Sequence, residues 1–218
     1  MSRVAWDISH REFTIEDHYY FSILKREATD RGIVIREVGG LDEIFSFDIL
    51  VINYPEEKFS KDEVEAIYTY VEEGGRVIIS GYYNNEDNNA DAINSITEHF
   101  GLRILDDVVI DEHNNIDGDK YFIVTGRVYG FSKGVTRIVM PCVAPIKIIC
   151  PKARVVAEAE DTAITRSGEP PILAACTSLG NGDIVLIGSC VFWDNYSIGK
   201  LDNLKFVLNM LLEQSIFK

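Results

Sequence analysis

Long apolar runs and basic residues are scarce in this chain of 218 residues. No apolar run approaches the roughly 20 residues that span a bilayer, so we expect no membrane insertion. The 21 Lys and Arg residues are outnumbered by 35 Asp and Glu residues, which gives a formal net charge of −14. Because phosphate backbones are bound by Lys and Arg, this balance argues against nucleic acid as a partner.

Cysteine is also scarce, and no CxxC pair occurs. The four cysteines lie in apolar, strand-like runs, at Cys142, Cys150, Cys176 and Cys190. A free thiol in such a run behaves as a small hydrophobic group, and these spacings do not suit zinc. The start of the chain leads directly into a strand without the pattern of a signal peptide. We therefore expect a cytoplasmic protein without a metal site.

Stretches that would mark a linker are missing as well. The chain has 6 prolines, and no Gly/Ser-rich or Pro-rich segment, repeat or low-complexity region interrupts it. Its 46% hydrophobic residues are enough to build a core. The sequence predicts a single domain over residues 1–218.

The first half alternates predicted strands and helices. The strands are Arg3–Ile8, Ile33–Val38, Phe47–Tyr54 and Arg76–Ser80, and the helices cover about residues 16–30, 61–73 and 90–100. Ser60 and Glu63 have the spacing of a capping box at the start of the second helix. Strands that alternate with helices over short connections predict a parallel sheet with helices on both faces.

The second half has a different pattern. Extended segments follow one another without clear helices, at Leu102–Asp111, Tyr121–Thr125, Thr136–Met140, Ala153–Glu158, Pro171–Thr177 and Ile184–Ser189. A tight turn at residues 179–183 joins the last two segments, and an amphipathic helix over Leu201–Gln214 follows. The predicted fold class is α/β, with an antiparallel-rich second half.

Ligands of open α/β sheets bind at the carboxyl ends of the parallel strands. The loops after the first, third, fourth and last strands therefore supply the candidate ligand-binding residues. These are Asp7, Ser9, His10, Asn53, Ser80, Tyr82, Asn84 and Asn195. Aromatic rings beside amides and carboxylates suit a small polar ligand such as a carbohydrate.

Asp7 and His10 are the strongest candidates for chemistry. A carboxylate beside an imidazole fixes its tautomer and raises its basicity, which suits a general base. The alternative is that Asp7 caps the loop and His10 is exposed. Ser80 follows a strand, but the large neighbours Ile78 and Tyr82 do not fit a nucleophile elbow. Cys190 has no histidine near it in the sequence, and we expect it to be buried and inert.

The sequence does not match the common motifs for calcium, phosphate or dinucleotide binding. The acidic segment Asp106–Asp119 does not fit a calcium loop, because His113 and Val124 stand where acids are required. We expect a solvated loop there. No P-loop is present, and Gly180-Asn181-Gly182 lacks the third glycine and the helix of a dinucleotide site. We expect no cofactor.

The order of short motifs along the chain resembles the GIFT domain superfamily, which includes the GldG-like proteins and the N-terminal domain of a subunit of intraflagellar transport complex B. The opening VAWDISH (residues 4–10), followed by Phe13 and Thr14, is similar to the strand, polar turn and Phe-Thr with which these domains begin. Further matching segments are Pro55–Ser60 with Glu63, Tyr70–Gly75, Val77–Ile79, Phe100–Leu102, Asp107–Val109 and Ile184–Cys190 with Phe192, Asp194 and Asn203. The resemblance covers nearly the whole chain.

This resemblance implies a flavodoxin-like, class I glutamine amidotransferase-like fold. True amidotransferases carry a cysteine after the fourth strand, with a histidine and an acid late in the chain. Here Ser80-Gly81-Tyr82 stands at that position, and no histidine follows His113. The resemblance thus implies a pseudoenzyme that binds a sugar or a protein partner.

Three functions remain open. The first is a non-catalytic module that binds a small polar ligand. The second is a protein-interaction domain with a vestigial crevice, and its partner could be a second copy of the chain in a homodimer. The third is a hydrolase that uses Asp7 and His10 on water. A deep polar pocket at Asp7, His10 and Asn84 would favour a ligand, whereas a crevice filled by Tyr82 or Tyr83 would favour protein interaction.

Overall fold

A central sheet of seven strands organises the computed structural model, which describes residues 2–217. The strand order is β11-β13-β14-β4-β3-β1-β2. These strands are β1 (Arg3–Asp7), β2 (Val34–Val38), β3 (Ile49–Asn53), β4 (Arg76–Ser80), β11 (Arg154–Glu158), β13 (Ile172–Leu179) and β14 (Gly182–Ile187). The five from β14 to β2 run parallel, and β13 and β11 extend the sheet in antiparallel fashion. The mixed α/β class is confirmed.

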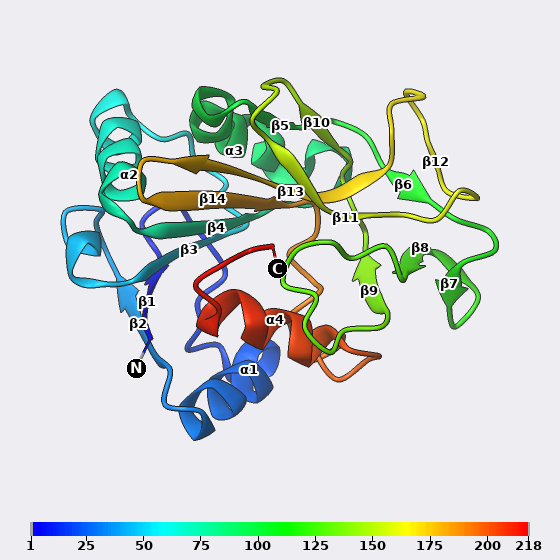
Figure 1. The fold of residues 1–218 in the computed structure, drawn as a ribbon, viewed down its shortest axis with the longest axis horizontal. Helices are drawn as coiled ribbons and strands as arrows, with labels where there is room; N and C mark the ends of the chain where they lie inside the picture. Colours follow the sequence, from blue (N-terminus) through cyan, green and yellow to red (C-terminus); the bar gives the residue numbers. More distant parts are fainter. Residues whose placement is uncertain (1, 218) are drawn as a thin grey trace.

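Helices cover both faces of this sheet. In Figure 1, α2 (Lys61–Glu73) and α3 (Asn89–Thr97) lie on one face, and α1 (His18–Asp30) and α4 (Asn203–Leu212) lie on the other. Two separate cores result. Trp6, Phe21 and Phe206 belong to the core under α1 and α4, whereas Ile67 and Ile93 belong to the core under α2 and α3. Within residues 2–217, no helix is both long and apolar enough to cross a bilayer.

Local sequence explains the central elements. All five residues of β3 and of β4 are buried, as expected of strands covered on both faces. The predicted capping box is present: Ser60 Oγ accepts from the Glu63 amide, and Glu63 Oε2 accepts from the Ser60 amide at 2.7 Å. The β13–β14 turn passes so close to the end of α2 that a Cβ on Gly182 would lie 2.2 Å from the Gly75 carbonyl oxygen.

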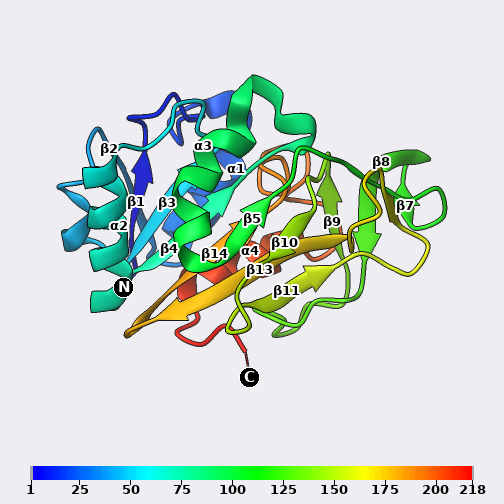
Figure 2. The same ribbon diagram turned by 90° about the horizontal axis from the view of Figure 1, so that it is seen from above.

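The second half adds three small antiparallel sheets. Figure 2 shows β5 and β10 near β13, and β7, β8 and β9 farther out, away from β1 and β2. They pair β5 (Leu102–Ile104) with β10 (Ile146–Ile148), β6 (Val109–Ile110) with β12 (Ile164–Thr165), and β8 (Asp119–Thr125) with both β7 (Asn115–Ile116) and β9 (Ile138–Pro141). The predicted antiparallel character is confirmed.

The prediction of a solvated loop over Asp106–Asp119 is wrong in part. Asp107 and Asp111 are buried. Each carboxylate accepts several hydrogen bonds from the neighbouring turns, which compensates for its burial. Asp107 accepts from the amides of Val108, Arg166 and Ser167. These acids stabilise the fold.

Arg76 joins the amino-terminal edge of the sheet to the end of the chain. Its guanidinium donates two hydrogen bonds to the Asp183 carboxylate, at 2.7 and 3.0 Å. It also donates to the carbonyl oxygens of Met210, Glu213 and Gln214, at 3.0, 2.7 and 3.3 Å. One buried side chain thus satisfies a strand carboxylate and the carbonyl groups at the end of α4.

We expect Arg76→Ala to lower the free energy of unfolding by about 3–5 kcal/mol, because it leaves the Asp183 carboxylate and three carbonyl groups without their donor. The matched control Arg103→Ala removes an exposed ion pair to Glu98 and should cost less than about 1 kcal/mol. Urea denaturation followed by circular dichroism measures both. Equal losses in the two variants would contradict the role given to Arg76.

Candidate functional site

The carboxyl ends of the parallel strands meet at one edge of the sheet, as predicted. Asn53 at the end of β3 pairs in register with Ser80 at the end of β4, and Ser80 pairs with Ile187 of β14. Asp7 ends β1 beside them. The loops that carry the candidate residues therefore start from neighbouring points of this carboxyl edge.

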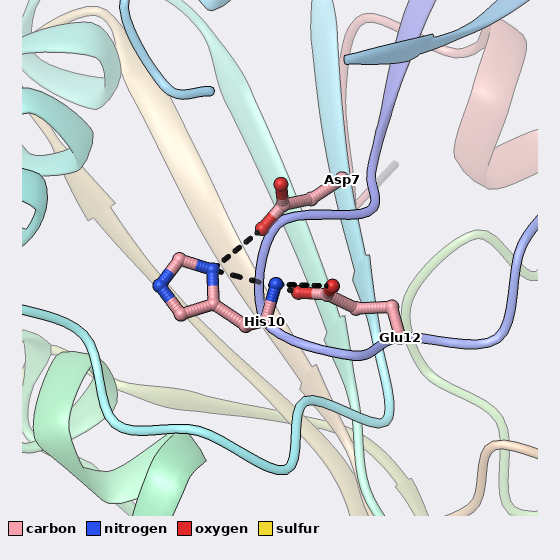
Figure 3. A group of neighbouring side chains, drawn as sticks. All are labelled: Asp7, His10 and Glu12. Carbon is pink, nitrogen blue, oxygen red and sulfur yellow. Dashed lines mark hydrogen bonds and ion pairs between the residues drawn. The ribbon is translucent and has the colours of Figure 1, made fainter. Parts of the chain in front are cut away.

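Asp7, Ser9, His10 and Glu12 form a buried polar cluster in the loop after β1, which we call the β1 cluster. Asp7 Oδ1 accepts from the Ser9 amide at 3.1 Å and from Ser9 Oγ at 2.7 Å, and Asp7 Oδ2 lies 3.1 Å from His10 Nδ1. Glu12 Oε2 accepts from the His10 amide at 2.7 Å, and Glu12 Oε1 lies 3.8 Å from His10 Nδ1. Figure 3 shows both carboxylates directed at the imidazole. The predicted pairing of Asp7 with His10 is confirmed, but His10 is buried rather than exposed.

Burial and mutual charge shift the ionisation of the β1 cluster. Burial raises the pKa of Glu12, and the neighbouring Asp7 charge raises it further, to about 8. Burial also acts to raise the pKa of Asp7, but the hydrogen bonds from His10 and Ser9 outweigh it and lower that pKa. Burial lowers the pKa of His10, but the hydrogen bond and charge of Asp7 raise it above its ordinary value. A proton on Glu12 and a charge on Asp7 therefore coexist near neutral pH.

The far side of the His10 ring packs against α2 and the loop before it. The ring stacks on Phe59, with centroids 3.7 Å apart and an angle of 24° between the planes. His10 Nε2 lies 3.4 Å from Oε1 of Glu63, the capping-box residue. His10 is 5% exposed, so neither ring nitrogen faces open solvent.

Asn53 and Ser80 face the interior beneath the carboxyl edge. Ser80 Oγ donates to Asn53 Oδ1 at 2.6 Å, and Trp193 Nε1 donates to the same oxygen at 3.1 Å. All three residues are fully buried. Their polar groups hold β3, β4 and the loop after β14 together.

Tyr82 and Asn84 lie in the loop after β4, where the backbone is unusual. Asn84, Asn85, Asp87 and Asn88 adopt positive φ angles of 55°, 49°, 53° and 61°. Asn and Asp tolerate this left-handed conformation better than most residues do. Asn84 is exposed, and its amide donates to the Asp107 carbonyl oxygen at 2.9 Å.

Asn195 is hydrogen-bonded to the start of α1, and Cys190 is buried. Asn195 Oδ1 accepts from the Ile23 amide at 2.9 Å, and its Nδ2 donates to the His18 and Tyr19 carbonyl oxygens at 3.1 and 2.7 Å. These bonds attach the loop after β14 to the first turns of α1. Cys190 is buried, as expected, and burial raises the pKa of its thiol.

Seven aromatic rings form a continuous row across this edge, which we call the aromatic stripe. In spatial order they are Tyr19, Tyr20, Phe13, Tyr54, Tyr82, Tyr83 and Tyr121, with successive centroids 5.0, 5.4, 5.2, 5.8, 4.7 and 6.0 Å apart. Tyr19 is 79% exposed, Phe13 39% and Tyr121 36%. The hydroxyl group of Tyr54 donates to Asp87 at 2.8 Å. Tyr82, one of the predicted ligand-binding residues, is therefore part of this stripe.

Glu12 and the stripe were not among the predicted site residues, and Glu63 was predicted only as a helix cap. Asp7, His10 and Glu12 each present one ligand-type atom, all within 4.8 Å of one another, which makes them the residues of this edge that could hold a metal ion. A cavity of about 540 Å³, bordered by Arg76 and Asp183, lies at the opposite edge of the sheet. The spacing Asp7-x-x-His10-x-Glu12 was the available signal for the metal-type cluster.

We expect Asn53→Ala to lower the free energy of unfolding by about 2–3 kcal/mol, because the buried donors of Ser80 and Trp193 lose their shared acceptor. Ser80→Ala removes one donor and leaves the Trp193 bond in place, so it should cost about 1 kcal/mol. Guanidinium denaturation of both variants measures the difference. A larger loss in Ser80→Ala than in Asn53→Ala would refute this description.

Known structures share the fold. The chain superposes on the mmIFT52 N-terminal domain with a TM-score of 0.82, over 97% of this chain and 98% of that one, at 18% identity. It also superposes on a cytoplasmic protein of Salmonella typhimurium with a TM-score of 0.63, over 99% of this chain and all of that one, at 15% identity. At these identities the likeness establishes the fold alone.

Sequence comparison gives the family. An uncharacterized protein of Aquifex aeolicus (strain VF5) is 46% identical over 218 aligned positions, covering 96% of this chain and 92% of the relative. The family model described as IFT52 GIFT domain matches residues 4–126, which is more than half of the chain. The resemblance drawn from the order of the motifs is confirmed, and the chain belongs to the GIFT domain family.

Proposed function

We propose that this GIFT domain is a non-catalytic module that binds a protein partner through the aromatic stripe. The observation that supports this most is the stripe itself, in which exposed rings from the loop after β1, from α1 and from β8 stand in one row with half-buried tyrosines and the buried Tyr54. Tyrosine and other aromatic residues are enriched in protein interfaces, where they bury much area at little cost in side-chain entropy.

The charge around the stripe indicates the chemistry of the partner. Asp87 accepts from Tyr54, and the charge of Glu86 acts on Tyr83. The chain as a whole has a formal net charge of −14. A partner surface that combines Lys or Arg with apolar side chains would complement these features, because opposite charges steer association and fix orientation.

Ser80 and His10 support the absence of catalysis. Ser80 ends β4, at the turn where the amidotransferase-like resemblance places the nucleophile, but its hydroxyl group donates to Asn53 rather than to a base. Hydrolysis by Asp7 and His10 would need an imidazole nitrogen that faces a water molecule. Nδ1 of His10 is directed at Asp7, and Nε2 lies near Glu63. We therefore infer a pseudoenzyme with an amidotransferase-like fold.

A small polar ligand such as a carbohydrate is the second candidate. One observation favours it: the half-buried Tyr82 ring lies beside Tyr54, whose hydroxyl group donates to the exposed carboxylate of Asp87. Aromatic faces beside carboxylates bind the apolar and hydroxyl faces of sugars. The fully buried Asp7, Asn53 and Ser80 would not contact such a ligand, which would bind at the stripe.

The test combines Tyr83→Ala with Tyr121→Ala in one stripe variant. The matched control is Tyr68→Ala, because Tyr68 is a similarly exposed tyrosine that packs on Phe100 from α2, outside the stripe. Proteins retained from an extract of the cells that make this chain are identified by mass spectrometry, and the affinity of each is then measured with purified components.

We expect a partner with a basic surface whose affinity falls about tenfold or more in the stripe variant, because truncation of interface aromatics is costly. The affinity should also fall as salt is raised and should be unchanged in Tyr68→Ala. Equal affinity of the partner for the unmodified protein, the stripe variant and Tyr68→Ala would contradict the proposal. Glycan binding that the stripe variant loses, without a protein partner, would establish the carbohydrate candidate instead.

A further inference from the structure

The β1 cluster holds two carboxylates around one imidazole nitrogen with little positive charge nearby. Within the described residues, the ion pairs of Asp7 and Glu12 involve His10 alone. Asp7 is fully buried, and Glu12 is 8% exposed. Glu12 Oε1 is buried and accepts no hydrogen bond. A cation bound between two buried acids this close together would offset their mutual repulsion in place of the proton on Glu12.

Each carboxylate directs one oxygen at the same point. The protein backbone and Ser9 hold Asp7 Oδ1 and Glu12 Oε2, so that Asp7 Oδ2 and Glu12 Oε1 are directed at Nδ1 of His10. The distances from Nδ1 to these two atoms are 3.1 and 3.8 Å. Ligand atoms about 2.1 Å from a tetrahedral ion lie roughly 3.4 Å apart, which falls between these values.

We propose that Asp7 Oδ2, His10 Nδ1 and Glu12 Oε1 form a binding site for a divalent first-row metal ion, with Zn²⁺ as the preferred ion. One imidazole and two carboxylates are ligands that Zn²⁺ accepts, and a hard ion such as Mg²⁺ favours oxygen ligands alone. Ser9 Oγ, 2.9 Å from Nδ1, borders the fourth position. The ion would stabilise the loop after β1, and no reaction is assigned to it.

The surroundings of His10 match those of a metal-ligating histidine. Such residues nearly always donate the N–H of the other ring nitrogen to a carboxylate, a carbonyl group or water, which fixes the tautomer. Glu63 Oε1 lies 3.4 Å from Nε2, in the place of that acceptor. Phe59 stacks on the ring and fixes its plane. The ligand nitrogen is therefore already oriented toward the two carboxylates.

Calorimetric titration of the untagged, chelator-treated protein with ZnCl₂ is the first test. We expect one Zn²⁺ per chain and a rise in the melting temperature, because an ion that binds only the folded chain stabilises it. Glu12→Gln should weaken binding at least tenfold, and Glu63→Gln about tenfold, because a neutral amide is a weaker acceptor for the Nε2 proton than the carboxylate is. The control Glu65→Gln changes an exposed acid of α2 and should leave the affinity unchanged.

Nitrogen NMR of the histidine rings keeps the proposal falsifiable if Glu12→Gln does not fold. The chain has 4 histidines, so Zn²⁺ should shift Nδ1 of His10 and leave His18, His99 and His113 in place. Mg²⁺ at the same concentration should not produce this shift. No bound Zn²⁺, a shift at another histidine, or equal affinity in a folded Glu12→Gln variant would each overturn the proposal.

Discussion

The carboxyl edge of the sheet depends on how the buried charge of Asp7 is held. A carboxylate at the end of β1, without any exposure, is stable only if its oxygens are satisfied, and Ser9 and His10 supply the donors. This requirement fixes the path of the loop after β1 and places the His10 ring on Phe59. Phe13, which follows in the same loop, joins Tyr20 and Tyr54 in the aromatic stripe. The polar cluster beneath thus positions the apolar surface above it.

Much of the fold could be predicted, because local patterns and global structure agree. A run that is apolar on both faces predicted β3, the alternation of strands and helices predicted β4, and Ser60 with Glu63 predicted the start of α2. The second half was harder to predict, since the apolar pattern of β11 is the same whether it extends the main sheet or forms a separate one. Pairing with β13 decides this, and such pairing between distant segments leaves no local signal.

The site could be predicted only as far as local spacing determines it. Asp7 and His10 meet because only two residues of a tight loop, Ile8 and Ser9, lie between them along the chain. Glu12 was missed because Arg11, with a φ of 63°, turns the chain back so that Glu12 faces His10. Asn53 was expected to face a ligand because it ends a strand, but Trp193, 140 residues away, takes its oxygen. Contacts of that kind depend on the assembled core.

Glu63 has two roles that link distant parts of the chain. Its Oε2 accepts from the Ser60 amide in the capping box, and its Oε1 lies beside His10 Nε2. The first turn of α2 and the loop after β1 therefore share one side chain, although about fifty residues separate them. Local opening of either segment would remove a contact from the other, so the two should open as one cooperative unit. Events at the β1 cluster would then be transmitted to α2 as a change in how often its first turn frays.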